Sequence, residues 1–161
     1  MSDEFTIRPF DDALAPDFHR INAAWIDAMF RLEPTDLDVL LHPRARIVDA
    51  GGAILFLEVP GEGVIGTVAL QKTGERQFEL TKMGVTPAAQ GRGAGEALLL
   101  AALAEADRLG AERLYLLTSA KCAAAIRLYE RHGFVHDAGI MQEFGGRYAR
   151  CDVAMLYAPG A

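Results

Sequence analysis

Apolar and polar positions follow three different patterns along the chain, and the first pattern occupies the N-terminal third. A short alternating segment, residues 5–10, predicts a strand. From Pro16 to Arg31, apolar side chains recur every three or four residues, which predicts an amphipathic helix. A shorter helical segment lies between Pro34 and Pro43. We therefore expect a strand followed by two helices in this part of the chain.

The middle of the chain is rich in residues that favour strands. Three such segments cover residues 53–59, 64–70 and 77–85, and the turns between them contain glycine. Turns this short connect neighbouring antiparallel strands. We therefore expect an antiparallel meander of three strands.

Helices and strands alternate in the last part of the chain. After Pro87 the spacing of Leu and Ala predicts a long helix, which is followed by a buried type of strand at residues 113–118. A second helix is predicted at residues 123–132. Two further strands are predicted at residues 134–135 and 151–157.

These elements together predict one α/β domain over residues 1–161, with a mixed, mostly antiparallel central sheet and flanking helices. One pair of strands should be parallel, because the long helix connects them and a strand–helix–strand unit normally pairs its strands in parallel. A length of 161 residues suits a single core. The hydrophobic fraction of 51% is high enough to exclude a disordered chain.

Charge and composition narrow the possible partners. The chain has 22 acidic and 16 basic residues and a net charge of −6, which would repel a nucleic-acid backbone. Its first four residues include Asp3 and Glu4, so this end is acidic where a signal peptide would be basic, and no apolar run is long enough to span a bilayer. Cys122 and Cys151 do not have the spacing of a metal site or a disulfide framework. We expect a cytoplasmic protein that binds no nucleic acid, membrane or metal.

A glycine-rich turn before the long helix is the strongest candidate for ligand binding. Residues 90–95 have the sequence Gln-Gly-Arg-Gly-Ala-Gly. Glycines leave the backbone amides accessible, and the start of the helix adds unpaired N–H groups and the positive end of the helix dipole. A phosphate or pyrophosphate suits this turn; the alternative is a tight turn that binds nothing. Spacing excludes a dinucleotide fingerprint, because Glu96 stands where Gly or Ala is required, and it excludes a P-loop.

Two motifs resemble those of the Gcn5-related N-acetyltransferase (GNAT) family. The central motif of this family, Gln/Arg-x-x-Gly-x-Gly/Ala, is matched by Gln90, Gly93 and Gly95. Residues 125–134 are similar to the family's later helix and the start of the next strand. The close match covers residues 78–135, and the flanks agree in the order of their elements. The resemblance implies the GNAT fold, with acetyl-CoA bound where two neighbouring parallel strands splay apart.

The resemblance also implies which residues hold acetyl-CoA. Backbone groups of residues 83–85 would pair with the pantetheine arm, and the turn and helix start would hold the pyrophosphate. Arg92 either approaches a phosphate or stays solvated. Cys122 stands where the family often has an asparagine that contacts pantetheine, so this contact is lost or is supplied by Ser119 or Lys121. The implied cofactor residues are Met83, Gly84, Val85, Gln90, Gly91, Arg92, Gly93, Ala94, Gly95, Glu96 and Cys122.

The resemblance implies transfer of the acetyl group of acetyl-CoA to a primary amine. Tyr129 stands where family members commonly have a tyrosine that protonates the leaving thiolate. A phenol with a pKa of ~10 can donate that proton. The alternative role for Tyr129 is a core aromatic with its hydroxyl at the surface.

More than one residue is a candidate for the base that would deprotonate the amine. Glu79 stands eleven residues before the glutamine of the central motif, where the protein-acetylating branch of the family has its glutamate base. Strand alternation would place Glu79 and Met83 on one face, toward the cleft, and Lys82 on the other. The alternative for Glu79 is an exposed carboxylate paired with Lys82 or Arg76. Glu58 on an earlier strand is a further candidate for the base.

Two functions remain compatible with these residues. The first is an N-acetyltransferase. The acidic surface of the chain would weakly favour a cationic amine as its acceptor. The second is a non-catalytic acyl-CoA sensor or interaction module on the same fold. The resemblance also implies a possible homodimer.

Overall fold

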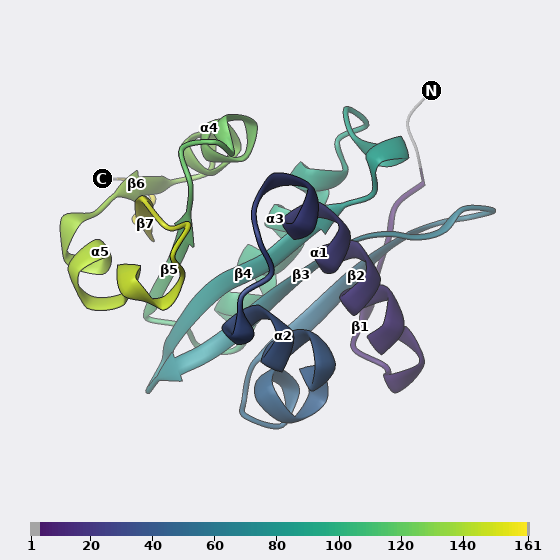
Figure 1. The fold of residues 1–161 in the computed structure, drawn as a ribbon, viewed down its shortest axis with the longest axis horizontal. Coiled ribbons are helices and arrows are strands. Elements are labelled where there is room, and N and C mark those ends of the chain that lie inside the picture. Colours follow the sequence, from purple (N-terminus) through teal and green to yellow (C-terminus); the bar gives the residue numbers. More distant parts are fainter. Residues whose placement is uncertain (1–3, 161) are drawn as a thin grey trace.

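The computed structural model describes residues 4–160, which fold around a seven-stranded sheet (Figure 1). The strands lie in the order β1-β2-β3-β4-β5-β7-β6. Their bounds are β1 Thr6–Pro9, β2 Ala53–Val59, β3 Gly63–Gly74, β4 Gln77–Val85, β5 Arg113–Thr118, β6 Phe134–His136 and β7 Val153–Tyr157. Among these described strands, β4 and β5 form the one parallel pair, and every other pair is antiparallel. The predicted mixed, mostly antiparallel sheet is confirmed.

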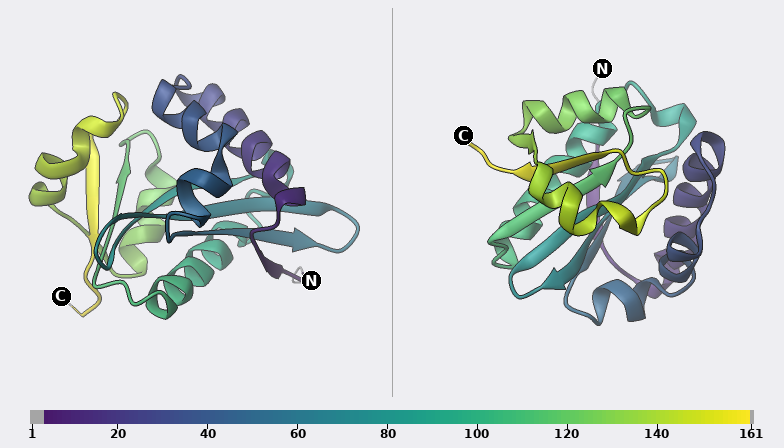
Figure 2. Two further views of the ribbon diagram at one scale, coloured as in Figure 1. Left: turned by 90° about the horizontal axis from the view of Figure 1, so that it is seen from below. Right: turned by 60° about the vertical axis from the view of Figure 1, so that its left-hand side comes forward.

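Helices cover both faces of the sheet. Helices α1 (Ala15–Met29) and α2 (Pro34–Leu41) lie on one side, and α3 (Ala94–Arg108) lies on the other (Figure 2). Helix α4 (Ala123–Arg131) packs beside α3, and α5 (Ala138–Phe144) packs on β5 and β7. Short helical turns complete the chain: η1 Asp12–Leu14, η2 Arg44–Val48, η3 Pro87–Ala89 and η4 Gly145–Arg147.

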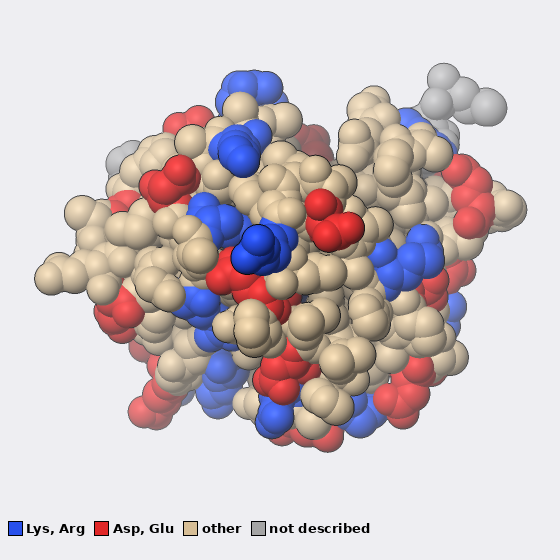
Figure 3. Space-filling model, in the orientation of Figure 1, with Lys and Arg blue, Asp and Glu red and all other residues tan. Residues whose placement is uncertain are grey.

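Apolar side chains form a core layer on each face of the sheet. Phe56 and Leu57 are neighbours on β2, so strand alternation sends their side chains to opposite layers. Leu57 packs in the layer that contains Leu98 of α3, whereas Phe56 packs in the layer that contains Phe18 of α1. Basic and acidic side chains are interspersed over the outer face shown in Figure 3.

Most element boundaries agree with the hydrophobic pattern, and one helix was not predicted. The strands predicted at residues 53–59, 77–85 and 113–118 have these same bounds in the structure. Helix α5 has seven residues and begins at Ala138, after the N-cap residue Asp137, whose side chain accepts a hydrogen bond from the backbone N–H of Ile140. Two turns of helix are too short for an apolar period to show in the sequence.

A β-bulge in β4 determines which of its side chains share a face. Lys82 has a φ of 53°, and the register between β3 and β4 shifts between Thr67 and Ala69. Two residues of β4 therefore lie opposite one residue of β3. The prediction from strict alternation is wrong beyond this point: Lys82 lies on the same side as Glu79, toward α2, whereas Met83 packs against the core layer of α3.

The parallel strands β4 and β5 separate after a short paired stretch. Pairing runs from Gln77 opposite Arg113 to Leu80 opposite Leu116, and β4 then continues to Val85 without β5 beside it. A bulge bends the strand that carries it. The bulge at Lys82 lies just beyond the last pair, Leu80 and Leu116. The bend in β4 therefore opens a gap between the carboxyl ends of the two strands.

Candidate active site

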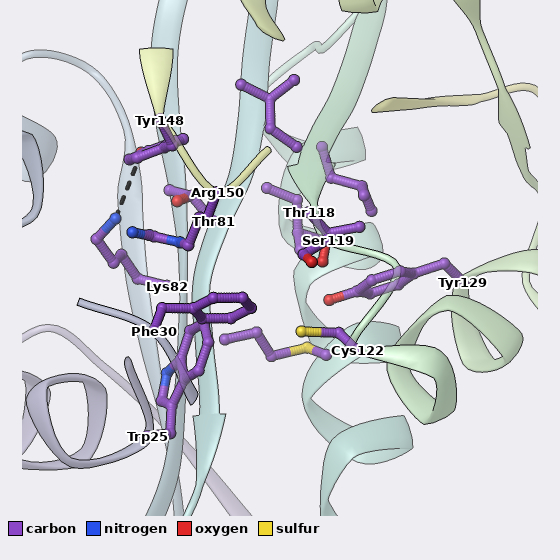
Figure 4. A pocket seen from close by; sticks show the side chains of 14 residues that line it. Trp25, Phe30, Thr81, Lys82, Thr118, Ser119, Cys122, Tyr129, Tyr148 and Arg150 are labelled. Atoms are coloured by element: carbon purple, nitrogen blue, oxygen red, sulfur yellow. Dashed lines mark hydrogen bonds between the residues drawn. The ribbon is translucent and has the colours of Figure 1, made fainter. Parts of the chain in front are cut away.

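Two adjoining cavities lie where β4 and β5 separate. The larger cavity, which we call the groove, has a volume of about 560 Å³ and runs along β4, the turn before α3 and the start of α4. The smaller cavity, which we call the inner pocket, has about 50 Å³ and lies between the diverging strands (Figure 4). The residues that line both cavities, and so mark their junction, are Trp25, Met83, Thr118, Cys122 and Tyr129.

The glycine-rich turn forms one end of the groove. Gly91 and Gly93 have φ values of 80° and 83°, a backbone conformation that side chains other than glycine rarely adopt. Gly93 is the N-cap residue of α3, whose first N–H groups have no carbonyl partner within the helix. These donors and the positive end of the helix dipole make this end of the groove favourable for an anion.

Tyr129 packs in the core and also lines both cavities. Its ring packs in the core layer of α3, with the Phe134 ring in an edge-on contact at a centroid distance of 5.7 Å. Its hydroxyl end points into the junction of the two cavities (Figure 4). Burial raises the pKa of Tyr129, with a smaller contribution from Cys122, so the hydroxyl stays protonated at neutral pH.

A buried ionic cluster lies on the side of the inner pocket opposite Tyr129. Oδ1 of Asp36 lies 2.9 Å from Nζ of Lys82 and 2.8 Å from Nη2 of Arg150. Burial disfavours the charge of Asp36, but the hydrogen bonds from Arg150 and the charge of Lys82 outweigh it and hold the pKa of Asp36 well below its ordinary value. Glu33 adds a further contact, with 3.1 Å between its Oε2 and Nη1 of Arg150.

Aromatic side chains form much of the remaining wall of the inner pocket. Trp25 and Phe30 line it from α1 and the residue after it, and Tyr148 lines it from the segment after α5 (Figure 4). Trp25 packs so closely on β4 that a Cβ at Gly84 would clash with its indole. The indole N–H donates to Oδ1 of Asn22 at 2.9 Å. Trp25 is therefore a cavity residue that is fixed by its own helix and by the lack of a side chain at Gly84.

Glu79 is buried and does not line either cavity. Its side chain is 1% exposed, and neither of its carboxylate oxygens has a hydrogen-bond partner within the described part of the chain. The nearest cation is Arg147, whose Nε lies 3.6 Å from Oε1 of Glu79. Burial raises the pKa of Glu79 against the opposing charges of Arg147 and Lys82. The alternative of an exposed strand carboxylate is wrong.

Comparison with known proteins identifies the family. The chain matches the model of the acetyltransferase (GNAT) family over residues 12–134. It belongs to this family. The uncharacterized N-acetyltransferase YjgM of Escherichia coli K12 is 37% identical over 108 residues, which cover 66% of this chain and 64% of that protein. A mycothiol acetyltransferase of Salinispora arenicola is 38% identical over 90 residues, which cover 53% of this chain and 29% of that protein. The chain thus spans less than two thirds of the length of these relatives.

Solved structures share the fold of this GNAT protein. A GNAT acetyltransferase from Staphylococcus aureus Mu50 superposes with a TM-score of 0.85 at 15% identity, with 96% of this chain and 99% of that chain covered. The putative acetyltransferase yncA from Salmonella typhimurium, solved with its cofactor acetyl-CoA, has a TM-score of 0.72 at 24% identity, with 95% and 92% covered. At these identities the likeness shows the common fold alone.

The side chains of Arg92, in the glycine-rich turn, and Glu96, at the start of α3, form ion pairs outside the two cavities of this GNAT protein. The guanidinium of Arg92 binds both carboxylate oxygens of Glu62 in the β2–β3 turn, at 2.9 and 2.7 Å, and does not line either cavity. The Glu96 carboxylate lies 3.1 Å from Nε2 of His132 and 3.3 Å from Nη2 of Arg131. Arg92 and Glu96 therefore have their charged groups in ion pairs, and neither residue lines the groove. The predicted residues that do line the groove are Met83, Gly84, Val85, Gln90, Gly91, Gly93, Ala94, Gly95, Cys122 and Tyr129.

The sequence motifs gave no signal for Lys82 or Arg150, which bring charge to the inner pocket of this GNAT protein. Lys82 reaches the pocket only because of the bulge, and Arg150 only because the chain returns after α5. Glu58, the further candidate for a base, is held by Arg8 across β1 and β2 at 2.8 Å and does not line either cavity. Within residues 4–160, no helix is long and apolar enough to cross a membrane, and no group of three His, Cys, Asp or Glu residues could hold a metal.

The raised pKa of Glu79 predicts a pH-dependent loss of stability. The folded state holds the Glu79 proton more tightly than the unfolded chain does, so the free energy of unfolding falls as the pH rises above the ordinary Glu pKa of 4.5. Glu79→Gln removes this titration. We expect the variant to be more stable than the wild type at pH 8, by on the order of 1 kcal/mol, and this difference to shrink at pH 5.

Urea unfolding at both pH values measures this difference. Glu75→Gln on the exposed β3–β4 turn is the matched control, and it should change stability by less than about 0.5 kcal/mol at either pH. A Glu79→Gln protein less stable than the wild type at pH 8 would mean that Arg147 keeps Glu79 ionised.

Proposed function

We propose that this protein is an N-acetyltransferase that transfers the acetyl group of acetyl-CoA to a primary amine. The observation that carries the proposal is the junction at Tyr129, where an anion-favouring groove meets a second, smaller pocket. Membership of the GNAT acetyltransferase family supports this function. So does the fold shared with yncA, which was solved with acetyl-CoA.

The groove suits the extended shape of acetyl-CoA. Beyond Leu80, the edge of β4 that faces β5 has no strand partner, and its residues 83–85 line the groove. An extended ligand with amide groups can pair with such an edge as an added strand does. The pantetheine arm has these amide groups, and the turn at Gly91–Gly95 would receive the pyrophosphate. The thioester would then lie near Tyr129, at the junction.

Acetyl transfer at this junction would break the thioester C–S bond and form a C–N bond. The nitrogen lone pair of the amine attacks the carbonyl carbon, and the CoA sulfur leaves as a thiolate that takes the proton of the Tyr129 hydroxyl. The attacking nitrogen loses one proton to solvent, and Tyr129 regains its own proton from solvent. The protonated state of Tyr129 at neutral pH fits this donor role.

The amine would bind in its neutral form. No Asp or Glu side chain of the described chain lines either cavity, so direct proton transfer to Glu79 does not fit the geometry. Lys82 and Arg150 line the inner pocket, and a positive charge beside an amine lowers the pKa of its ammonium form. The cavity thus favours the nucleophilic form of the acceptor without a carboxylate base.

A non-catalytic acyl-CoA sensor on the same fold is the second candidate. Two observations favour it: Cys122 stands where the family often has asparagine, and no carboxylate of the described chain touches the cavities. A sensor would bind acetyl-CoA without releasing CoA in the presence of an amine.

Thiol release distinguishes the enzyme from the sensor. We expect steady, amine-dependent release of CoA thiol when the protein is mixed with acetyl-CoA and a panel of primary amines. Acetyl-CoA binding is measured in parallel by calorimetry. Binding without release for every amine of the panel would overturn the enzyme and support the sensor.

Replacement of Tyr129 by Phe tests the proton donor. Tyr129→Phe removes the hydroxyl and keeps the ring, so kcat should fall by about 10² or more while acetyl-CoA binding is retained. Tyr115→Phe is the matched control, because Tyr115 is also buried but donates to Oγ1 of Thr73 and does not line either cavity. The control should keep kcat within about twofold. An unchanged kcat in Tyr129→Phe would remove Tyr129 from the chemistry.

Replacement of Gly93 by Ala tests the anion end of the groove. The φ of 83° at Gly93 strains any other residue, so the variant should shift the first turn of α3 and weaken acetyl-CoA binding by about tenfold. Gly61→Ala is the control, since Gly61 has a φ of 81° in the β2–β3 turn and nothing near its Cβ position. Both variants are strained, but Gly61→Ala should bind acetyl-CoA as the wild type does. Equal affinities for all three proteins would contradict a role of this turn in cofactor binding.

A further inference from the structure

The charged side chains that line the two cavities are all cationic. Lys82 and Arg150 line the inner pocket, Lys121 lines the groove, and no Asp or Glu of the described chain lines either cavity. The chain as a whole has a net charge of −6. The lining therefore has the opposite sign to the whole chain, and the cationic acceptor expected from the overall charge would find no carboxylate to bind it.

The acidic groups of the ionic cluster lie behind the cations and hold them in place. Asp36 is fully buried, and both of its oxygens are used: Oδ1 by Lys82 and Arg150, and Oδ2 by Arg150 and the backbone N–H of Glu33. Asp36 therefore presents no acceptor to the pocket. It fixes the two cationic groups at the pocket wall, which lowers the entropy cost of ligand binding.

Both cations have hydrogen-bond donors left for a ligand. The ammonium group of Lys82 has three donors, of which Asp36 at 2.9 Å and the Tyr148 hydroxyl at 3.3 Å take two. The guanidinium of Arg150 has five donors, and its three hydrogen bonds to Glu33 and Asp36 leave two. A carboxylate has two oxygens in a geometry that suits an arginine fork.

We propose that the acceptor is an amine that also carries a carboxylate, as a free amino acid does, and that Arg150 and Lys82 bind this carboxylate. The proposal rests on the proposed function, because it names the substrate class of the same site. The carboxylate would occupy the cationic side of the inner pocket, and the amino group would face the junction at Tyr129. Trp25 and Phe30 would contact the apolar part of the acceptor.

The competing explanation is that the cluster is only structural. Lys82, Asp36 and Arg150 join β4, α2 and the segment before β7, and such a link stabilises a fold whether or not a ligand binds. A structural role would affect all acceptors equally. Carboxylate binding would affect only acceptors that have a carboxylate, so a preference between matched amines separates the two explanations.

Matched amines are the first arm of the test. CoA release is measured with each of the common amino acids, with its methyl ester and with the decarboxylated amine, and with aliphatic diamines. For the best amino acid, we expect kcat/KM to exceed that of its ester and of its amine by about tenfold or more. Equal or better use of the esters, amines or diamines would overturn the carboxylate proposal and leave the N-acetyltransferase standing. Absence of release with every amine would overturn the proposed function itself.

A paired substitution is the second arm. Arg150→Gln combined with Asp36→Asn removes one cation together with the charge of Asp36, so that carboxylate is not left without Arg150; Lys82 loses its ion pair and keeps the Tyr148 hydroxyl as a partner. We expect the preference for the amino acid over its matched amine to fall below about threefold, through a higher KM for the amino acid, with an unchanged KM for acetyl-CoA. The control combines Arg46→Gln with Asp38→Asn, an exposed pair at 2.9 Å that lies outside both cavities, and it should keep the full preference.

A single substitution covers the case in which the paired variant does not fold. Lys82→Met keeps the Asp36–Arg150 contact and removes only the ammonium group. It should lower the preference by about threefold or more. A folded variant of either kind that keeps the full preference would overturn the proposal.

Discussion

The separation of β4 from β5 is the constraint on which the rest of the site depends. Parallel strands bond along their length unless something bends one of them, and here pairing stops at Leu80 and Leu116, next to the bulge at Lys82. The separation leaves a strand edge without a partner, places Tyr129 of α4 across from it, and opens the space that both cavities occupy. A regular β4 could continue to pair with the last residues of β5 and would close this space.

The bulge also makes the ionic cluster possible. Without it, Lys82 would project into the apolar layer of α3, where an unpaired ammonium group is strongly unfavourable. With the bulge, Lys82 contacts Asp36 of α2. Asp36 also binds Arg150, which lies 114 residues after Asp36 in the chain. Removing one partner of such a buried pair typically costs about 3–5 kcal/mol. The cluster therefore links helix α2 to the C-terminal segment on one side of the opening, where hydrogen bonds between β4 and β5 do not hold the fold together.

The sequence predicted what depends on local pattern and missed what depends on irregularity. Strands β2, β4 and β5 follow from β-forming segments between turns, and the glycine turn follows from the need for a positive φ at Gly91 and Gly93. The bulge has no local signature, because the positive φ falls on a lysine, and strict alternation therefore misplaced Lys82 and Met83. The position of Arg150 was also missed. It depends on the short helix α5 and the turn after it, which bring the chain back to α2.

Around the inner pocket, the acidic side chains are buried behind basic side chains that line the pocket. The same arrangement stabilises the fold and determines the charge that an acceptor meets. Asp36 lies behind two cations that use its full hydrogen-bonding capacity, so it can stay ionised without facing the pocket. Glu79 lies 3.6 Å from Nε of Arg147 and has no hydrogen-bond partner within the described chain, its pKa is raised by burial, and it does not line either cavity. What an acceptor meets is therefore positive, although the chain is acidic overall. A positive wall selects the neutral, nucleophilic form of an amine, and a carboxylate on the acceptor would offset the repulsion that the wall otherwise creates.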